Sequence, residues 1–275
     1  MRLDYKHKKW DRQVKQDIKV WDQMGGFAPL RYIEGKTEAT KKKLPKERDY
    51  QTFYYMYSSE YDAASESVYL RDIGSQQVFT FTYLSGRAAI MERMFAVLYK
   101  KNGKEVWNEE AAAKQFNDAI FKMIAVNQPL PKCIDNVENI YVQLLNGNIQ
   151  NVEKLLLEDN YNLDNLFGTR LDENRCRDIQ AIIQRDEKAL KEQLINRIKE
   201  DRREPIDYFR IIDIYSVGMI KLARRYEMDI DIDVIEIPKM FVGENQYSID
   251  KSKEELPFFE EAVADLQKSG IEFDA

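Results

Sequence analysis

The chain has 275 residues and a mass of 32.5 kDa, with 44% hydrophobic and 33% charged residues, which is the composition of a folded globular protein. A chain of this length can bury a sizeable core without disulfides. It contains one histidine and two cysteines, which excludes a histidine-based metal site, an ordinary Ser-His-Asp triad and a disulfide framework. We therefore expect no metal site and no cofactor.

The start of the sequence, Met1 to Lys6, has no apolar segment of the kind that directs secretion. No stretch without a charged residue is longer than fourteen residues, the length of 73–86, whereas a membrane-spanning helix needs about 20 apolar residues. Cys133 and Cys176 show no metal-binding spacing, and two thiols without an export signal are typical of a reducing compartment. The sequence thus predicts a cytoplasmic protein with no membrane partner, and it leaves open whether the two cysteines ever pair.

Charge is unevenly distributed along the chain, whose formal net charge is −6. Residues 1–50 hold fourteen Lys or Arg and eight Asp or Glu, whereas residues 227–275 hold four Lys or Arg and fourteen Asp or Glu. The acidic end repels nucleic acid and attracts basic partners, so we expect no nucleic-acid partner. The alternative is that both charged ends are ordinary solvated surface.

In the first half, apolar residues recur at helical spacing over 5–24, where Trp10, Val14, Ile18 and Trp21 share one face before Gly25-Gly26. A Lys-rich loop over 34–48 follows, and a second helix carries the stripe Tyr50, Phe53, Tyr54, Tyr57 and Tyr61. Residues 77–84 are rich in β-branched and aromatic types and fit either a short strand or a buried helix. Ser85 is a candidate cap for a helix that ends at Asn102-Gly103, and another helix runs from Asn108 to before Pro129.

The second half predicts two helical hairpins 38 residues apart, "QLLNGNIQNVEKLL" and "AIIQRDEKALKEQL". A further helix over 209–223 carries Ser216 and Gly218, small residues that permit close backbone approach by a neighbour. Next, "MDIDIDVIEIP" alternates apolar and acidic residues, as a half-buried extended strand does. Pro257 is placed at the first turn of a last helix that buries Phe259, Val263 and Leu266.

These patterns predict a mainly all-α fold of stacked helical hairpins with at most one or two short strands. We expect one domain over residues 1–275. It can be subdivided into an N-terminal helical half, 1–128, and a helical-hairpin half with an acidic tail, 137–275, because Pro129 and Pro131 interrupt the pattern between them.

Three groups of residues are candidates for a catalytic, metal-binding or nucleic-acid-binding site. His7 lies among lysines that discourage its protonation, and no partner for catalysis is evident. Asp229, Asp231 and Asp233 resemble the start of a calcium loop, but the isoleucines between them and the missing glycine favour a strand with outward acids. The aromatic stripe over 50–69, near Lys41 to Lys43, could serve a single-stranded nucleic acid, although its helical period favours a core.

The sequence contains no nucleotide-binding glycine loop, no G-x-S-x-G, no H-E-x-x-H and no C-x-x-C. Carboxylate pairs are uninformative in a chain with 48 acids. We therefore expect no catalytic residues and no enzymatic activity, and an enzyme with an undetected carboxylate site remains an alternative.

The stretch from Asn139 to Phe241 resembles the immunity protein 49 family of bacterial polymorphic toxin systems. The likeness rests on "YVQLLNGNIQNVEKLL", on "AIIQRDEKALKEQL" and on "IIDIYSVGMIKLARRYEMDIDIDVIEIPKM". Within the last segment, the residues that match the family's usual placement are Asp213, Ser216, Gly218, Leu222, Ala223 and Pro238.

The resemblance implies a mainly helical cytoplasmic protein that binds one cognate toxin and blocks it without chemistry of its own. Many toxins of such systems are nucleases with basic clefts, which an acidic strip could occupy. The residues that we expect at the partner-binding surface are Asp229, Asp231, Asp233, Glu236 and Glu244. The alternative function is a helical-repeat scaffold that binds a peptide or protein in a concave groove.

Overall fold

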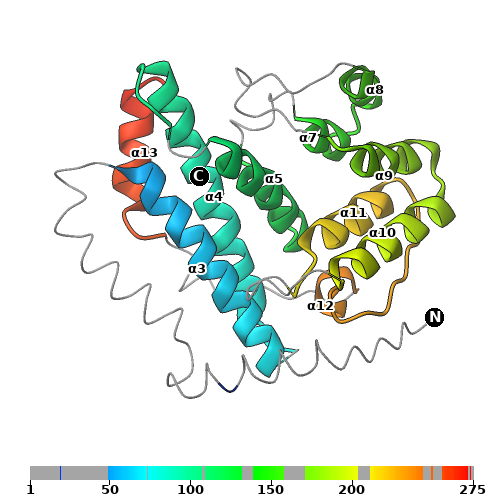
Figure 1. Cartoon of the computed structure of the whole chain (residues 1–275). Helices are drawn as coiled ribbons and strands as arrows, with labels where there is room; N and C mark the ends of the chain where they lie inside the picture. The colour runs from blue at the N-terminus through cyan, green and yellow to red at the C-terminus, as the bar shows by residue number, and fades with distance from the viewer. Residues whose placement is uncertain are drawn as a thin grey trace.

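The computed structural model describes residue 19 and residues 49–72, 74–106, 109–131, 139–157, 171–203, 211–243, 249, 256–271 and 273. Within these ranges all regular secondary structure is helical, which confirms the predicted all-α fold (Figure 1). The helices are α3 (Tyr50–Arg71), α4 (Gln77–Lys101), α5 (Glu109–Ala125), α7 (Ile140–Leu145), α8 (Ile149–Leu157), α9 (Glu173–Gln184), α10 (Glu187–Asp201), α11 (Ile214–Arg225), α12 (Lys239–Val242) and α13 (Phe259–Lys268).

Several of these helices begin where an Asp or Asn side chain can accept the unpaired amides of the first turn. The carboxylate of Asp186, for example, accepts a hydrogen bond from the amide of Ala189 at 2.9 Å. The residues that cap helices in this way are Asp49, Asn139, Asp172, Asp186 and Asp213. The starts of α3, α7, α9, α10 and α11 are therefore encoded locally.

Helices α3 and α4 lie side by side and run in opposite directions (Figure 1). Their buried contact contains polar pairs at seven-residue intervals on both helices. Gln51 donates to Glu92 at 3.0 Å, the hydroxyls of Ser58 and Ser85 lie 3.2 Å apart, and the Ser65 hydroxyl donates to the carbonyl of Val78 at 3.2 Å. A seven-residue repeat on both helices is the register of an antiparallel coiled coil.

Residues 77–84 belong to α4, so the helical alternative is correct for this segment. Ser85, predicted as a helix cap, instead lies in the interior of α4, where its hydroxyl donates to the carbonyl of Ser58 at 2.9 Å. The β-branched and aromatic residues of this segment do not indicate a strand, because α3 and α5 pack against α4 and bury most of its surface.

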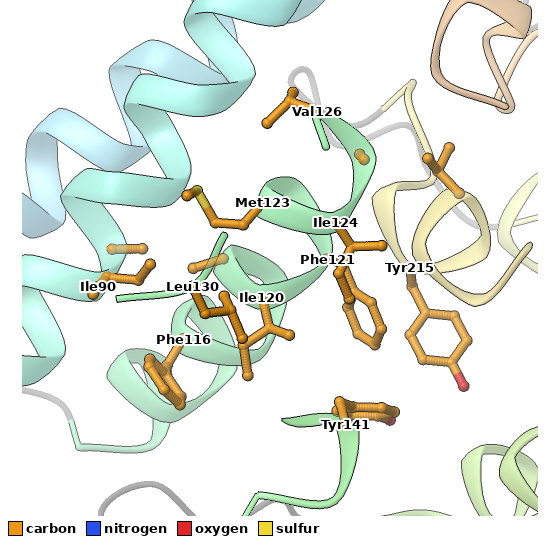
Figure 2. Packing of buried hydrophobic residues seen from close by; sticks show 14 of the residues in the cluster. Ile90, Phe116, Ile120, Phe121, Met123, Ile124, Val126, Leu130, Tyr141 and Tyr215 are labelled. Carbon is orange, nitrogen blue, oxygen red and sulfur yellow. The ribbon is translucent and has the colours of Figure 1, made fainter. Parts of the chain in front are cut away.

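Helix α11 is at the centre of the second half and packs against α5, α7, α9 and α12. Gly218 permits this packing, since a Cβ atom at that position would lie 2.3 Å from Cδ1 of Phe121 on α5. The Phe121 ring also meets the rings of Tyr141 and Tyr215 edge to face, with centroids 4.6 Å and 5.0 Å away (Figure 2). Gly218 therefore permits a close approach as predicted, although the group that approaches is the side chain of Phe121 and not a neighbouring backbone.

The last turn of α11 binds the ends of three neighbouring helices through their carbonyl groups. Lys221 donates to Ala125 of α5 at 2.7 Å, and Arg225 donates to Leu145 of α7 at 3.2 Å. Arg224 donates in the same way to the carbonyl of Val242 in α12. Cations at helix C-termini satisfy carbonyls that have no partner within their own helix. They also interact favourably with the negative end of the helix dipole.

The two predicted hairpins form as α7–α8 and α9–α10 (Figure 1). Their turns place Gly147 and Arg185 in the left-handed region, with φ of 73° and 55°. The turns predicted at Asn146-Gly147-Asn148 and Gln184-Arg185-Asp186 are thus confirmed.

Helix α13 packs against α4, so the last described helix lies beside the first ones (Figure 1). The guanidinium of Arg87 on α4 lies 4.2 Å from the ring centroid of Phe259, and Tyr54 donates to the carbonyl of Pro257 at 3.1 Å. The prediction that Pro257 starts the helix is wrong, because α13 begins at Phe259, after Phe258 in the left-handed region.

The predicted helix over 5–24, the loop over 34–48, and the residues His7, Asn108, Cys133 and Glu244 lie outside the described residues, apart from the helical residue Lys19. Cys176 on α9 is a free thiol. Among the described helices, none combines the length and the apolar character needed to cross a bilayer.

We expect Gly218→Ala to lower the free energy of unfolding by about 1–3 kcal/mol, because the new methyl group overlaps Phe121. Urea denaturation measures the change. Gly74→Ala is the matched control, since its Cβ has only an ordinary contact, 3.7 Å from Asp72. Adding Phe121→Leu should restore part of the loss. An unchanged stability of Gly218→Ala would contradict the role of this contact.

Candidate functional site

The candidate site is the loop between α11 and α12, residues 227–236, which we call the acidic loop. Met228, Ile230 and Ile232 are buried, whereas Asp229 and Asp231 are exposed. The predicted alternation is therefore confirmed over residues 228–232, whereas Asp233 and Val234 are both partly exposed. However, residues 228–233 pair with no neighbouring strand within the described ranges, so the segment is a loop fixed by its buried isoleucines and not a sheet strand.

The beginning of the acidic loop is held by the turn of the α9–α10 hairpin. The amide of Asp229 donates to the carboxylate of Glu187, the first residue of α10, at 2.9 Å. In addition, Arg185 pairs with Glu227 at 3.1 Å. The Arg185–Glu227 pair lies on the surface and contributes little by itself. The hydrogen bond from the Asp229 amide to Glu187 and the burial of Met228 fix where the loop leaves α11.

The end of the acidic loop is held by a buried ion pair. Arg202, after α10, contacts both carboxylate oxygens of Glu236, and its Nη2 lies 2.6 Å from Oε2. The Glu236 side chain is only 11% exposed. Its carbonyl accepts from the amide of Asp213 at 2.8 Å. A bidentate arginine contact fixes both position and orientation, so the loop is attached at both ends.

The structure divides the five predicted partner-binding residues into different classes. Asp229 and Asp231 are exposed, and their carboxylates take part in no ion pair with any described residue. Asp233 is partly exposed and pairs with Lys239 at 3.2 Å. Glu236 is buried, and Glu244 lies outside the described residues.

The expectation that Glu236 belongs to an exposed acidic strip is therefore corrected, because its side chain is buried against Arg202. Its partner, Arg202, is 34 residues away in the sequence, and the local alternation of residue types gives no sign of it. The residues that the structure adds to the site are Arg185, Glu187 and Arg202, which hold the loop. Their only sequence signal is their place at the turn of the second predicted hairpin and after the last helix of that hairpin.

A second polar cluster lies between α9, α10 and α11 and was not found from the sequence. Asp178 of α9 is fully buried and accepts from the hydroxyl of Tyr215 at 2.8 Å and from Arg197 of α10. The Arg197 guanidinium lies 4.2 Å from the centroid of the Tyr215 ring. Burial raises the pKa of Asp178, and the charge of Arg197 opposes that shift. This cluster fixes the α9–α10 hairpin on α11, and hence fixes the residues that hold the acidic loop.

One arrangement resembles a catalytic nucleophile with its base. Lys122 donates to the hydroxyl of Ser85 at 2.9 Å and to Asp62 at 2.6 Å. A serine hydroxyl beside an amine is the geometry of a Ser–Lys nucleophile. Ser85, however, is fully buried between α3 and α5, where a substrate has no access to it. The group instead joins the three helices through a polar contact.

No group of three or more His, Cys, Asp or Glu side chains among the described residues is arranged to hold a metal ion. Comparison of the chain with models of known protein families, with curated proteins and with solved structures gives no match.

We expect Glu236→Ala to lower the free energy of unfolding by about 3 kcal/mol, because it removes the bidentate carboxylate partner of the buried Arg202 guanidinium. Asp229→Ala should change stability by less than about 0.5 kcal/mol, since that side chain is exposed. Thermal or urea unfolding of the two variants tests the division. Replacing both partners, as Glu236→Leu with Arg202→Met, should restore most of the loss. Equal effects of the two alanine variants would show that Glu236 is not anchored as described.

Proposed function

We propose that the chain is an immunity protein of the immunity protein 49 type, which binds one cognate protein toxin in the cytoplasm and blocks it. The binding surface includes the acidic loop, and the protein carries out no reaction of its own. The observation that carries this proposal is a loop with two exposed aspartates, Asp229 and Asp231, that form no ion pair with a described residue, on a backbone attached at both ends.

A loop held in place suits recognition for two reasons. Its backbone loses little conformational freedom on binding, so less of the interaction energy is spent on ordering it. Unpaired carboxylates also accept new charged hydrogen bonds without first breaking an internal ion pair. Asp229 and Asp231 fulfil this condition, whereas Glu227 and Asp233 already have basic neighbours.

The residues that carry the family resemblance support the proposal through their positions. Asp213 caps α11 by accepting from the amide of Ser216 at 3.0 Å, and Gly218 permits the contact with α5. Pro238 immediately precedes α12, at the end of the acidic loop. These residues build the support of the loop and do not belong to its exposed face.

The charge of the loop indicates the chemistry of the partner. Asp229 and Asp231 complement a basic surface, and such complementarity speeds association. A toxin that acts on nucleic acid needs a basic surface to bind phosphates. We therefore expect the toxin to present lysines or arginines to the acidic loop, and a nuclease is the candidate class.

Co-expression with the product of the gene directly upstream tests the proposed function. We expect the upstream product to be toxic alone, to be tolerated when this chain is present, and to co-purify with it. Toxicity that persists in the presence of this chain, without a complex of the two proteins, would refute the proposal.

The double variant Asp229→Lys/Asp231→Lys tests the interface. We expect the affinity for the toxin to fall at least about tenfold, about 1.4 kcal/mol, with a slower association rate and a weaker salt dependence. Calorimetry or surface plasmon resonance at two salt concentrations measures both. Glu105→Lys/Glu153→Lys makes the same change of charge at exposed positions on other elements and is the control. Equal affinities of the two double variants would place the interface elsewhere.

A further inference from the structure

The end of the acidic loop is joined to helix α3 by a row of polar contacts that the proposed function does not use. Glu66 of α3 accepts a hydrogen bond from the amide of Ile212 at 2.9 Å. One turn further along α3, the hydroxyl of Tyr69 donates to the carbonyl of Ile235 at 2.8 Å. We call these contacts, together with the bond from the amide of Asp213 to the carbonyl of Glu236, the α3 seam.

Glu66 is buried in the α3 seam, with 5% of its surface exposed. Its Oε1 atom accepts from Ile212, whereas Oε2 is buried without a hydrogen-bond partner. The nearby cation, Lys122 of α5, already donates to Asp62 and to Ser85. A carboxylate here therefore has no ion-pair partner among the described residues, and burying a charge without one is costly.

Four titratable groups influence Glu66 or the atoms around it. Asp62 of the same helix favours its neutral form, and Lys122 of α5 favours its charged form. Tyr69 of α3 and Glu236 of the acidic loop complete the seam, and neither is a cation. Burial is the largest effect and raises the pKa of Glu66 from 4.5 to about 8, although the amides of Ile211 and Ile212 oppose the shift.

We propose that Glu66 is a pH-dependent lock on the acidic loop. In its neutral form it keeps α3 docked on residues 211–213 and on the end of the loop. When it loses its proton, hydration of the carboxylate favours opening of the seam, which frees residues 235–237 from α3. This property belongs to the chain alone and does not require the proposed toxin.

The direction of the effect follows from the two protonation equilibria. In the closed seam the pKa of Glu66 is about 8, and in an opened, hydrated seam it returns toward 4.5. Between these values, opening releases one proton, so the opening equilibrium constant rises about tenfold for each pH unit. Above pH 8 both states are ionised and the constant becomes independent of pH.

Native-state hydrogen exchange of the full chain measures the opening directly. The reporting amides are those of Ile212, Asp213 and Ile237, which bond to the Glu66 carboxylate, to the Glu236 carbonyl and to the Val234 carbonyl. After correction for intrinsic exchange, their protection in the wild type should fall about tenfold per pH unit between pH 5 and pH 8.

Glu66→Gln keeps an acceptor oxygen for the amide of Ile212 and removes the titration, so the protection of the reporting amides should not change with pH. Glu92→Gln is the matched control. Glu92 is also buried, and burial raises its pKa to about 7, but it lies at the other end of the α3–α4 pair beside Gln51. In this control the pH dependence at the reporting amides should persist. A slope that persists in Glu66→Gln, or one that Glu92→Gln removes equally, would overturn the proposal.

Tyr69→Phe provides a second variant in case Glu66→Gln fails to fold. It removes the bond to the carbonyl of Ile235 but leaves Glu66 in place. Protection of the reporting amides should be lower at every pH, whereas its change per pH unit should equal that of the wild type. Loss of the pH dependence in Tyr69→Phe would show that Glu66 does not control the seam.

Discussion

The contact between α11 and α5 is the constraint on which the second half of the molecule depends. Only a glycine at position 218 leaves room for the ring of Phe121, and that ring in turn contacts Tyr141 and Tyr215 (Figure 2). Once α11 is seated there, the cations of its last turn reach the final carbonyls of three neighbouring helices. A helix with buried small residues in its middle and basic residues at its end thus positions four neighbouring helices, α5, α7, α9 and α12. Enlarging residue 218 would move α11 away from α5 and would disturb all of these contacts.

The acidic loop acquires its geometry from the same helix. It leaves the C-terminal end of α11, and its two attachments, Glu187 and Arg202, lie near the two ends of α10. Helix α10 is itself fixed on α11 through Arg197, Asp178 and Tyr215. The exposed aspartates are therefore presented by a framework of α9, α10 and α11, and they do not belong to a free tail. This arrangement separates two roles that acidic residues commonly share, because buried Glu236 holds the loop and exposed Asp229 and Asp231 are available to a partner.

The fold buries polar side chains between α3 and its neighbours, among them Gln51, Ser58, Ser65 and Glu66. Such groups are costly unless they are paired, and a shift in helix register would leave them unpaired. The seven-residue spacing of Gln51, Ser58 and Ser65 against α4 therefore favours one alignment of the two helices. Glu66 lies on the same helix, and its incomplete pairing is what gives the α3 seam its proposed sensitivity to pH.

The sequence by itself determined the helical class, the two hairpins with their turns, the close approach at Gly218 and the alternating burial over residues 228–232. These features depend on interactions between residues a few positions apart, namely helical periodicity, capping side chains and glycine or left-handed turns. The tertiary structure alone decided that residues 77–84 are helical, that Ser85 lies within a helix, and that Glu236 is buried against Arg202. It also brought together Asp178 with Arg197 and Glu66 with Ile212, pairs that are 19 and 146 residues apart. Burial on several sides and partners distant in sequence are properties of the packed chain, and a local pattern of residue types does not contain them.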